Sequence, residues 1–368
     1  MNVSDFITAF EKVVPPAIAW KGDNVGLQIG KPENKISSIL LALDVTLEVV
    51  HEAIAKKANL IVTHHPLLFH PLKRISPDSR AGAIAMKIIE HNISLYAAHT
   101  NLDSVKNGVN FALGKKLGLK NLAVLSPVKE SLTKIAVFVP LTHVEAVAEA
   151  MHSAGAGMFS KYDLCSFRTK GTGTFRGMNN ASPYIGKVGM TEKVEEARIE
   201  MLCEHWKLSS VLRAMIKAHP YEEVAYDIYP LENMNSEYGL GAVGTLSNAL
   251  SVNEFLRYIS HVLKTPSLRY TPGNKKTKIK TVALCGGSGA EFIPNALAAG
   301  AEAFITADLK YHTFQEYEDR ILLIDAGHFE TEHIVLDSLR NIIQHIVGKA
   351  CTIYKTKKNT NPVHYYTS

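Results

Sequence analysis

The stretch ANLIVTHHP, residues 58–66, decides the predicted fold, because a short apolar run ends abruptly in two histidines and a proline. The β-branched residues of the run predict a buried strand. Pro66 cannot continue a strand ladder and disfavours helical backbone at His65, so the strand ends at the histidines. Ligands of open α/β sheets bind at the carboxyl ends of the strands. The stretch therefore predicts a ligand site, with a pair of ordinary loop histidines as the alternative.

The flanking sequence predicts an α/β fold around this strand. A strand over residues 36–43 and a helix over 47–57 precede it, which makes a β-α-β unit with parallel pairing. The further elements expected in this part of the chain are a helix over 4–13 capped by Ser4 or Asp5, a helix over 80–90, a strand over 94–98, and a helix over 109–117 ending at Gly118.

Two segments far apart in the chain repeat the same pattern. Residues 58–65 align with residues 301–308, and each segment is preceded by strand, turn and helix. The strands that follow end at His99 and His328, and a carboxylate stands four residues later in each copy, at Asp103 and Glu332. A repeat of this kind predicts two related lobes that face one another across a cleft.

The histidines and carboxylates of the two copies form a candidate metal-ligand set. Its members are His64, His65, Asp103, His328 and Glu332, with His99 close by. One tetrahedral ion needs fewer ligands, and a carboxylate can bridge, so two ions ~3.5–4 Å apart are the economical arrangement. A set of nitrogen and oxygen donors without thiolate suits zinc, manganese, iron, cobalt or nickel. Such ions lower the pKa of bound water and supply hydroxide near neutral pH.

Two glycine-containing loops have open interpretations. Residues 22–30 predict either a turn with a short strand or a pocket-lining loop with Asp23 and Asn24 as polar contacts. Residues 286–289 follow a strand, and they predict either a phosphate cradle or a tight turn into the next helix.

Residues 127–239 follow a different pattern and predict an inserted domain. Its expected elements are strands over 134–139, 187–188, 198–202 and 224–229, helices over 144–153 and 208–218, and a linker over 230–238. Two successive β-α-β halves predict a ferredoxin-like sandwich. The motif HPYEE, residues 219–223, predicts a turn before an edge strand rather than a functional site, and the insert carries no cluster of metal-ligand residues.

Composition excludes several classes of protein. The 368 residues predict two domains, with 46% hydrophobic and 20% charged residues as in soluble globular proteins. The net charge of +5 permits an anionic substrate, and the short basic run 275–278 predicts a surface loop rather than a nucleic-acid site. The widely spaced cysteines predict neither a disulfide framework nor a zinc ribbon. No secretion signal and no run of ~18–20 apolar residues is found, so we expect a cytoplasmic protein without a membrane span.

The joint motif set resembles that of the GTP cyclohydrolase 1 type 2 homologue family, also called dinuclear metal-centre proteins. The resemblance covers residues 1–125 and 240–368. The motifs that carry it are Asp23-Asn24-x-Gly26-Leu27, Thr63-His64-His65-Pro66, His99-Thr100-x-x-Asp103 with Gly108-Val109-Asn110, Asp308-x-Lys310-Tyr311-His312, and Gly327-His328-x-x-Thr331-Glu332. The family's usual glycine before the acid of the fourth motif is Ala307 here.

The resemblance implies a discontinuous α/β domain, residues 1–126 plus 240–368, interrupted by an insert similar to PII and CutA proteins. It implies two metal ions per subunit, bound by the five ligands named above, and zinc is the metal we expect first. It also implies a toroidal homohexamer. The family name suggests GTP, with metal-activated water opening the guanine ring and His99 transferring protons. The alternatives are a phosphoester or amide hydrolase and a non-enzymatic scaffold that binds a metal or nucleotide. Nucleic-acid binding is not expected.

Overall fold

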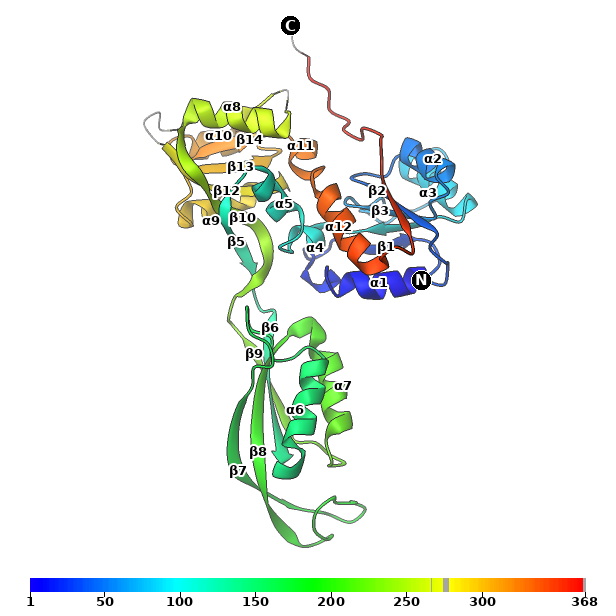
Figure 1. Cartoon of the computed structure of the whole chain (residues 1–368), viewed down its shortest axis with the longest axis vertical. Helices are drawn as coiled ribbons and strands as arrows, with labels where there is room; N and C mark the ends of the chain where they lie inside the picture. Colours follow the sequence, from blue (N-terminus) through cyan, green and yellow to red (C-terminus); the bar gives the residue numbers. More distant parts are fainter. Residues whose placement is uncertain (266, 274–277, 367–368) are drawn as a thin grey trace. The chain divides into compact units, whose positions relative to one another are not determined.

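The computed structural model describes residues 1–265, 267–273 and 278–366 (Figure 1). The chain divides into two units, Met1–Pro127 with Glu237–Ser368, and Val128–Ser236. These bounds differ by one and three residues from the limits expected for the insert. Residues 275–277 of the basic run lie outside the described residues.

The first sheet of the discontinuous unit contains the His-His strand. Its order is β1 (Gly26–Ile29), β4 (Ser94–Ala97), β3 (Leu60–Thr63), β2 (Ser38–Ala42) and β15 (Thr352–Lys355). The last four strands pair in parallel, and β1 lies antiparallel to β4. The apolar faces of α2 (Leu47–Ala55) and α3 (Arg80–Glu90) form a core with these strands. The long run of buried residues in β2, β3 and β4 explains why these strands were predictable.

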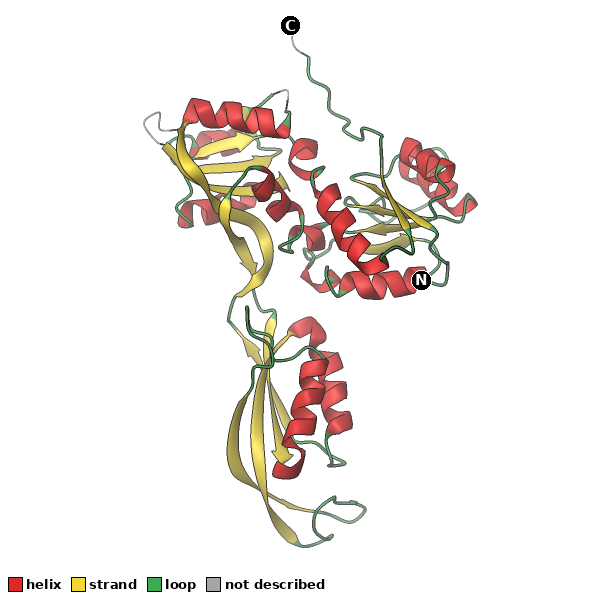
Figure 2. Cartoon of the chain, viewed as in Figure 1, coloured by secondary structure: helices red, strands yellow, loops and turns green. Residues whose placement is uncertain are grey.

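The second sheet has a parallel centre and antiparallel neighbours. Its order is β11 (Arg269–Tyr270), β14 (Leu322–Asp325), β13 (Ala303–Ala307), β12 (Lys278–Ser288), β10 (Asn235–Ser251) and β5 (Lys120–Val128). Strands β12, β13 and β14 are parallel, whereas β10 pairs antiparallel to β12 and β11 pairs antiparallel to β14. Helices α5 (Val109–Lys116) and α8 (Val252–Leu263) pack on one side, and α9 (Ile293–Ala298) packs on a separate core. The predicted α/β fold with a repeated strand-helix pattern is confirmed, with mixed sheets (Figure 2).

The discontinuous unit contains seven further helices among its described residues. They are α1 (Val3–Glu11), η1 (Pro16–Ile18), α4 (Thr100–Asp103), η4 (Ala290–Phe292), α10 (Tyr311–Tyr317), α11 (His328–Glu332) and α12 (Val335–Val347). The predicted cap of the first helix is wrong: Asn2 is the N-cap, and the Asp5 side chain completes a capping box. The sequence after His328 also predicts one long helix running to about Val347, and this prediction is wrong because the segment forms two helices, α11 and α12. In the described part of the chain, no helix is long and apolar enough to cross a membrane.

The insert has the strand and helix order of a ferredoxin-like sandwich, as predicted. The elements follow as β6 (Leu132–Pro140), η2 (Leu141–His143), α6 (Val144–Ser153), β7 (Phe167–Arg176), β8 (Thr191–Glu204), η3 (His205–Lys207), α7 (Leu208–Ala218) and β9 (Tyr226–Leu231). The sheet order is β7-β8-β6-β9, with antiparallel pairs. Buried residues of α6 and α7 pack on one face of the sheet.

Several predicted elements of this region are wrong. Residues 187–188 are not a strand, and the hairpin strand β7 lies in the glycine- and threonine-rich segment that carried no strand prediction. The expected linker over 230–238 is shorter, because β9 continues to Leu231 and β10 begins at Asn235. Strand β7 is an edge of its sheet and is largely exposed, so it lacks the apolar pattern of a buried strand.

Candidate metal centre

The two histidines after β3 take different environments at the strand end. His64 is fully buried, and its Nδ1 lies 2.8 Å from the Ala98 carbonyl oxygen, which follows the neighbouring parallel strand β4. His65 is partly exposed, and the Thr63 hydroxyl donates a hydrogen bond of 2.8 Å to its carbonyl. A carbonyl can only accept, so Nδ1 of His64 carries the proton and its Nε2 presents a lone pair.

Three further imidazoles are held through Nδ1 by carboxylates. The distances are 2.7 Å from His65 to Asp44 Oδ1, 2.7 Å from His328 to Asp308 Oδ2, and 2.9 Å from His99 to Asp23 Oδ1. Such a partner fixes the ring and leaves Nε2 free for a metal or a proton. Each acid follows or precedes a strand end, so the sheet topology sets the direction of every ring.

The free nitrogens converge on the carboxylate of Glu332, which α11 carries. Oε2 of Glu332 lies 3.0 Å from Nε2 of His65 and 3.1 Å from Nε2 of His328. Nε2 of His64 lies 3.6 Å from Oδ1 of Asp103 and 3.8 Å from Oε1 of Glu332. The structure thus brings together all five predicted ligands, from both copies of the repeat. Ligand atoms of His99 also lie within 4.8 Å of those of His64 and His65.

The centre contains buried polar atoms that no protein group satisfies. Among the described side chains, His64 Nε2, Asp103 Oδ1 and Glu332 Oε2 are buried and have no hydrogen-bond partner. A buried polar atom without a partner costs free energy, and such atoms gathered at one point indicate a ligand between them. Imidazole nitrogens facing carboxylate oxygens fit a divalent cation, and the His/Glu cluster is consistent with a metal site.

The charges of this cluster are mutually dependent. Burial would raise the pKa of Glu332, but the surrounding imidazoles of His328, His64 and His65 hold this pKa well below its usual value. Burial raises the pKa of Asp103 to about 6. Burial would lower the pKa of His65 and His328, but their carboxylate partners raise the values to about 9 and about 10. A cation that binds here would replace the protons on these imidazoles.

The glycine turn after β12 forms one wall of the centre. Gly287 has φ +63°, and a Cβ atom at this position would collide with Glu332 Oε1 and lie 3.2 Å from His328 Nε2. Its N–H donates to the Thr331 hydroxyl at 3.0 Å, and the Thr306 hydroxyl donates to its carbonyl at 2.9 Å. The turn therefore leaves space for the Glu332 carboxylate. The N–H and carbonyl of Gly287 both form hydrogen bonds within the protein.

The loop over residues 22–30 supports the opposite wall. Asp23 accepts hydrogen bonds from Thr100 as well as His99, and these contacts outweigh burial and lower its pKa to about 2. The Asn24 side chain donates to the Leu68 carbonyl at 2.6 Å. That contact holds the segment carrying Phe69, whose half-exposed ring lies 6.1 Å from the His99 ring. The loop contains the turn and short strand of one interpretation, since β1 begins at Gly26, and Asp23 and Asn24 make the polar contacts named in the other.

Sequence reasoning missed two supporting groups. Asp44 is the first group, and its place after β2, beside β3, is the signal that could have suggested a contact with His65. The C-terminal segment was not considered at all. There the Thr360 hydroxyl donates to Asp44 Oδ2 at 2.8 Å, and the Asn361 amide donates to Glu330 Oε1 at 3.1 Å. This segment contacts groups beside His65 and beside Glu332.

Comparison with known proteins points to one family. A family model described as Duf34/NIF3 (NGG1p interacting factor 3) matches residues 1–362. A protein of Halalkalibacterium halodurans named GTP cyclohydrolase 1 type 2 homolog is 43% identical over 89% of this chain and 88% of its own length. A Bacillus subtilis protein of the same name is 39% identical over 98% of both chains. A solved structure, a Bacillus cereus protein related to NIF3, superposes with a TM-score of 0.88 at 38% identity, covering 100% of this chain and 99% of that one.

Proposed function

This chain belongs to the Duf34/NIF3 family, and from that premise we propose that it is a dinuclear metal-dependent hydrolase that opens the ring of a purine nucleotide. The printed name of its relatives, GTP cyclohydrolase 1 type 2 homolog, supports a nucleotide such as GTP as the substrate. The observation that carries the proposal is the set of unsatisfied buried atoms on His64, Asp103 and Glu332.

Five side chains hold the two ions in this proposal. The ions would be held by His64, Asp103, His65, His328 and Glu332, and the Glu332 carboxylate lies within 4 Å of the imidazoles of His64, His65 and His328. Zinc is our first expectation, with manganese, iron, cobalt or nickel as alternatives. When bound, two such metal ions supply Lewis-acid activation of water and substrate.

The other residues of the site orient and transfer protons. His99 offers Nε2 toward the centre while Asp23 holds Nδ1, so His99 is placed to move a proton to or from the substrate. Phe69 gives a planar heterocycle an exposed aromatic ring next to His99. Asp44 and Asp308 position the two metal-binding imidazoles through their Nδ1 atoms.

We also propose that the protein works in the cytoplasm as a toroidal homohexamer, on the basis of the family resemblance. Light scattering of the purified chain measures the mass of the assembly and hence the number of subunits. A particle six times the 40.4 kDa chain mass supports the assembly, and a stable monomer contradicts it.

Turnover of GTP tests the catalytic proposal. The chain loaded with zinc or manganese is incubated with GTP, and formate and a pterin-type product are measured. We expect product from the wild type, none from His65→Ala, and wild-type activity from His51→Ala, an exposed histidine on α2. If the metal-loaded wild type makes no more product than His65→Ala, GTP ring opening is ruled out as its activity. Phosphate release or amide cleavage on a substrate panel would then point to the other hydrolase chemistries.

A further inference from the structure

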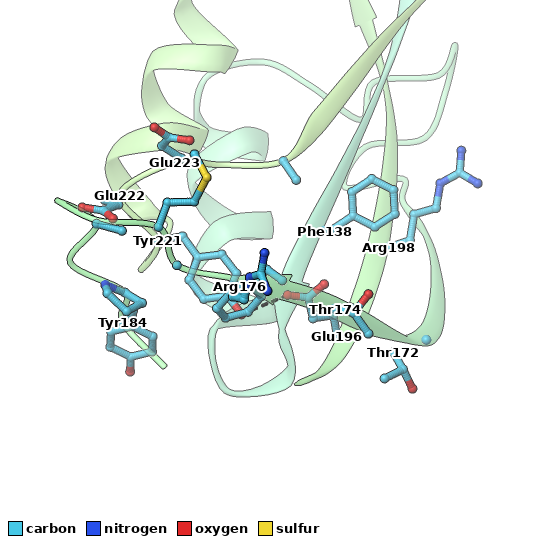
Figure 3. Close-up of a pocket in the computed structure, with 18 of the residues that line it drawn as sticks. Phe138, Thr172, Thr174, Arg176, Tyr184, Glu196, Arg198, Tyr221, Glu222 and Glu223 are labelled. Carbon is cyan, nitrogen blue, oxygen red and sulfur yellow. Dashed lines mark hydrogen bonds between the residues drawn. The ribbon is translucent and has the colours of Figure 1, made fainter. Parts of the chain in front are cut away.

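The insert contains a cavity of about 1250 Å³ that the metal centre does not use. It is lined by β7 and its following loop, by β8, and by the turn after α7 (Figure 3). Its walls include the rings of Phe138, Phe175, Tyr184 and Tyr221. The volume is larger than the ~300–1,000 Å³ usual for small-molecule sites, and the aromatic lining is typical of them.

One charged side chain of the lining is buried, Glu196 on β8, which is 8% exposed. Its Oε1 accepts a hydrogen bond of 2.9 Å from the Tyr221 hydroxyl, and Figure 3 draws the two groups side by side. Among the described residues, Glu196 has no cationic partner within ion-pair distance and its Oε2 accepts no hydrogen bond. Although the residue is largely buried, this oxygen is not among the fully enclosed unsatisfied atoms, so a cationic ligand in the cavity can reach it and supply the missing counter-charge.

The neighbours of Glu196 are neutral or directed elsewhere. Burial lowers the pKa of His219, whose Nε2 contacts the Phe138 carbonyl at 2.9 Å and whose Nδ1 accepts from the Tyr221 N–H. Burial and the adjacent carboxylate raise the pKa of Tyr221, so it remains a neutral donor. Arg198 pairs with Glu200 at 3.1 Å and extends away from Glu196 (Figure 3).

The remaining charges of the cavity lie at its exposed rim. Lys170, Arg176, Glu222 and Glu223 are all solvent-exposed, and they contribute two charges of each sign. The net charge of the lining therefore favours neither an anionic nor a cationic ligand. The carboxylate of Glu196 favours a cation. Aromatic rings support this selection, because their faces attract cations: Phe175 and Tyr184 lie with ring centroids 5.8 and 6.3 Å from Tyr221.

We propose that this cavity binds a small organic cation through an ammonium group, with Glu196 as its counter-ion and the rings of Phe175, Tyr184 and Tyr221 around it. Gly173 on β7 keeps the carboxylate accessible, since a Cβ at this position would collide with Glu196 Oε2. Gly171, which also lines the cavity, has open space at the same point. The two glycines therefore form a matched pair for substitution.

Calorimetric titration of the full chain tests the proposal with two cationic probes, choline and spermidine, and with 3,3-dimethylbutanol, an uncharged analogue of choline. We expect at least one cation to bind. If choline binds, its affinity should exceed that of the neutral analogue by about tenfold, which corresponds to roughly 1.4 kcal/mol of binding free energy. Glu196→Gln and Gly173→Ala should each reduce cation affinity by at least about tenfold, with Gly171→Ala within about twofold of the wild type.

The outcomes separate clearly. Circular dichroism and the melting temperature of each variant verify that it is folded, and Glu196→Gln changes no volume in the cavity. Failure of both cations to bind would overturn the proposal. Equal binding of choline and its neutral analogue, or unchanged cation affinity in a folded Glu196→Gln protein, would overturn it as well.

Discussion

At the scale of single residues, the orientation of each histidine depends on the group that holds its Nδ1 atom. His64 uses a backbone carbonyl, whereas His65, His328 and His99 use carboxylates. A carboxylate makes an imidazole more basic and hence a stronger ligand, but it also favours the protonated ring when no metal is bound. The same contacts therefore govern metal affinity and the pH response of the metal-free protein.

Replacing Asp44 tests this orientation. Asp44→Asn keeps the shape of the side chain but removes the charge that holds His65, so we expect zinc affinity to fall about 10- to 100-fold. Competition with a chromophoric chelator measures the affinity. Asp319→Asn, on an exposed position after α10, is the matched control and should leave it unchanged. Wild-type affinity in a folded Asp44→Asn protein would show that this carboxylate does not support the site.

The pKa of His328 predicts a pH dependence of stability for the metal-free chain. Its folded value of about 10 exceeds the ordinary value of 6.5, so the folded state binds the proton more tightly than the unfolded state. This contribution is fully present below about pH 6.5 and is lost as the pH rises toward 10. In EDTA, urea unfolding should show a larger loss of stability between pH 6 and pH 10 for the wild type than for His328→Gln. An equal loss in both proteins would contradict the assignment.

At the scale of elements, the carboxyl ends of β3, β4, β13 and β14 carry the site, and the C-terminal segment contributes from outside the sheets. Thr360 holds the Asp44 oxygen that does not contact His65. The hydroxyl thus acts on the imidazole through the acid, which makes Thr360 a positioning residue.

Thr360→Val should reduce zinc affinity by less than about tenfold, because it removes one support of Asp44 and no ligand. Thr360→Ser keeps the hydroxyl and should restore the affinity. Thr356→Val is the control on the same segment, since Thr356 donates to Glu52 instead. A chelator competition that finds the same affinity in Thr360→Val and Thr360→Ser would exclude this role.

The N-terminal cap gives a prediction about stability alone. Asn2 accepts from the Asp5 N–H at 2.7 Å, and the Asp5 side chain accepts from the Asn2 N–H at 3.0 Å. Asn2→Ala should lower the free energy of unfolding by about 1 kcal/mol in urea titrations without changing metal content. No change in stability would mean that α1 does not depend on this cap.

Sequence reasoning succeeded where one strand carried enough local information. Strand β3 was predictable because its apolar run ends in a proline, and the repeated His-x3-carboxylate pattern identified the residues that the structure brings together. It failed for β15 and β5, since they lie at sheet edges and their pairing depends on distant partners. Asp44 and Thr360 escaped notice for the same reason: 316 residues separate them, and only the fold makes them neighbours.

At the scale of the whole molecule, both ends of the chain complete one unit. Strand β15 near the C-terminus pairs in parallel with β2, and the site residues of the N-terminal copy face those of the C-terminal copy. Nε2 of His65 and Nε2 of His328 lie 3.3 Å apart although 263 residues separate them. The candidate metal centre is consequently a property of the assembled unit and not of either copy alone.

The most direct test of the central claim is anomalous X-ray scattering from a crystal of the zinc-loaded chain. The account predicts two anomalous peaks ~3.5–4 Å apart, contacted by His64, His65, Asp103, His328 and Glu332. A crystal soaked in zinc that shows no ion between these residues, or ions bound by one copy of the repeat alone, would contradict it.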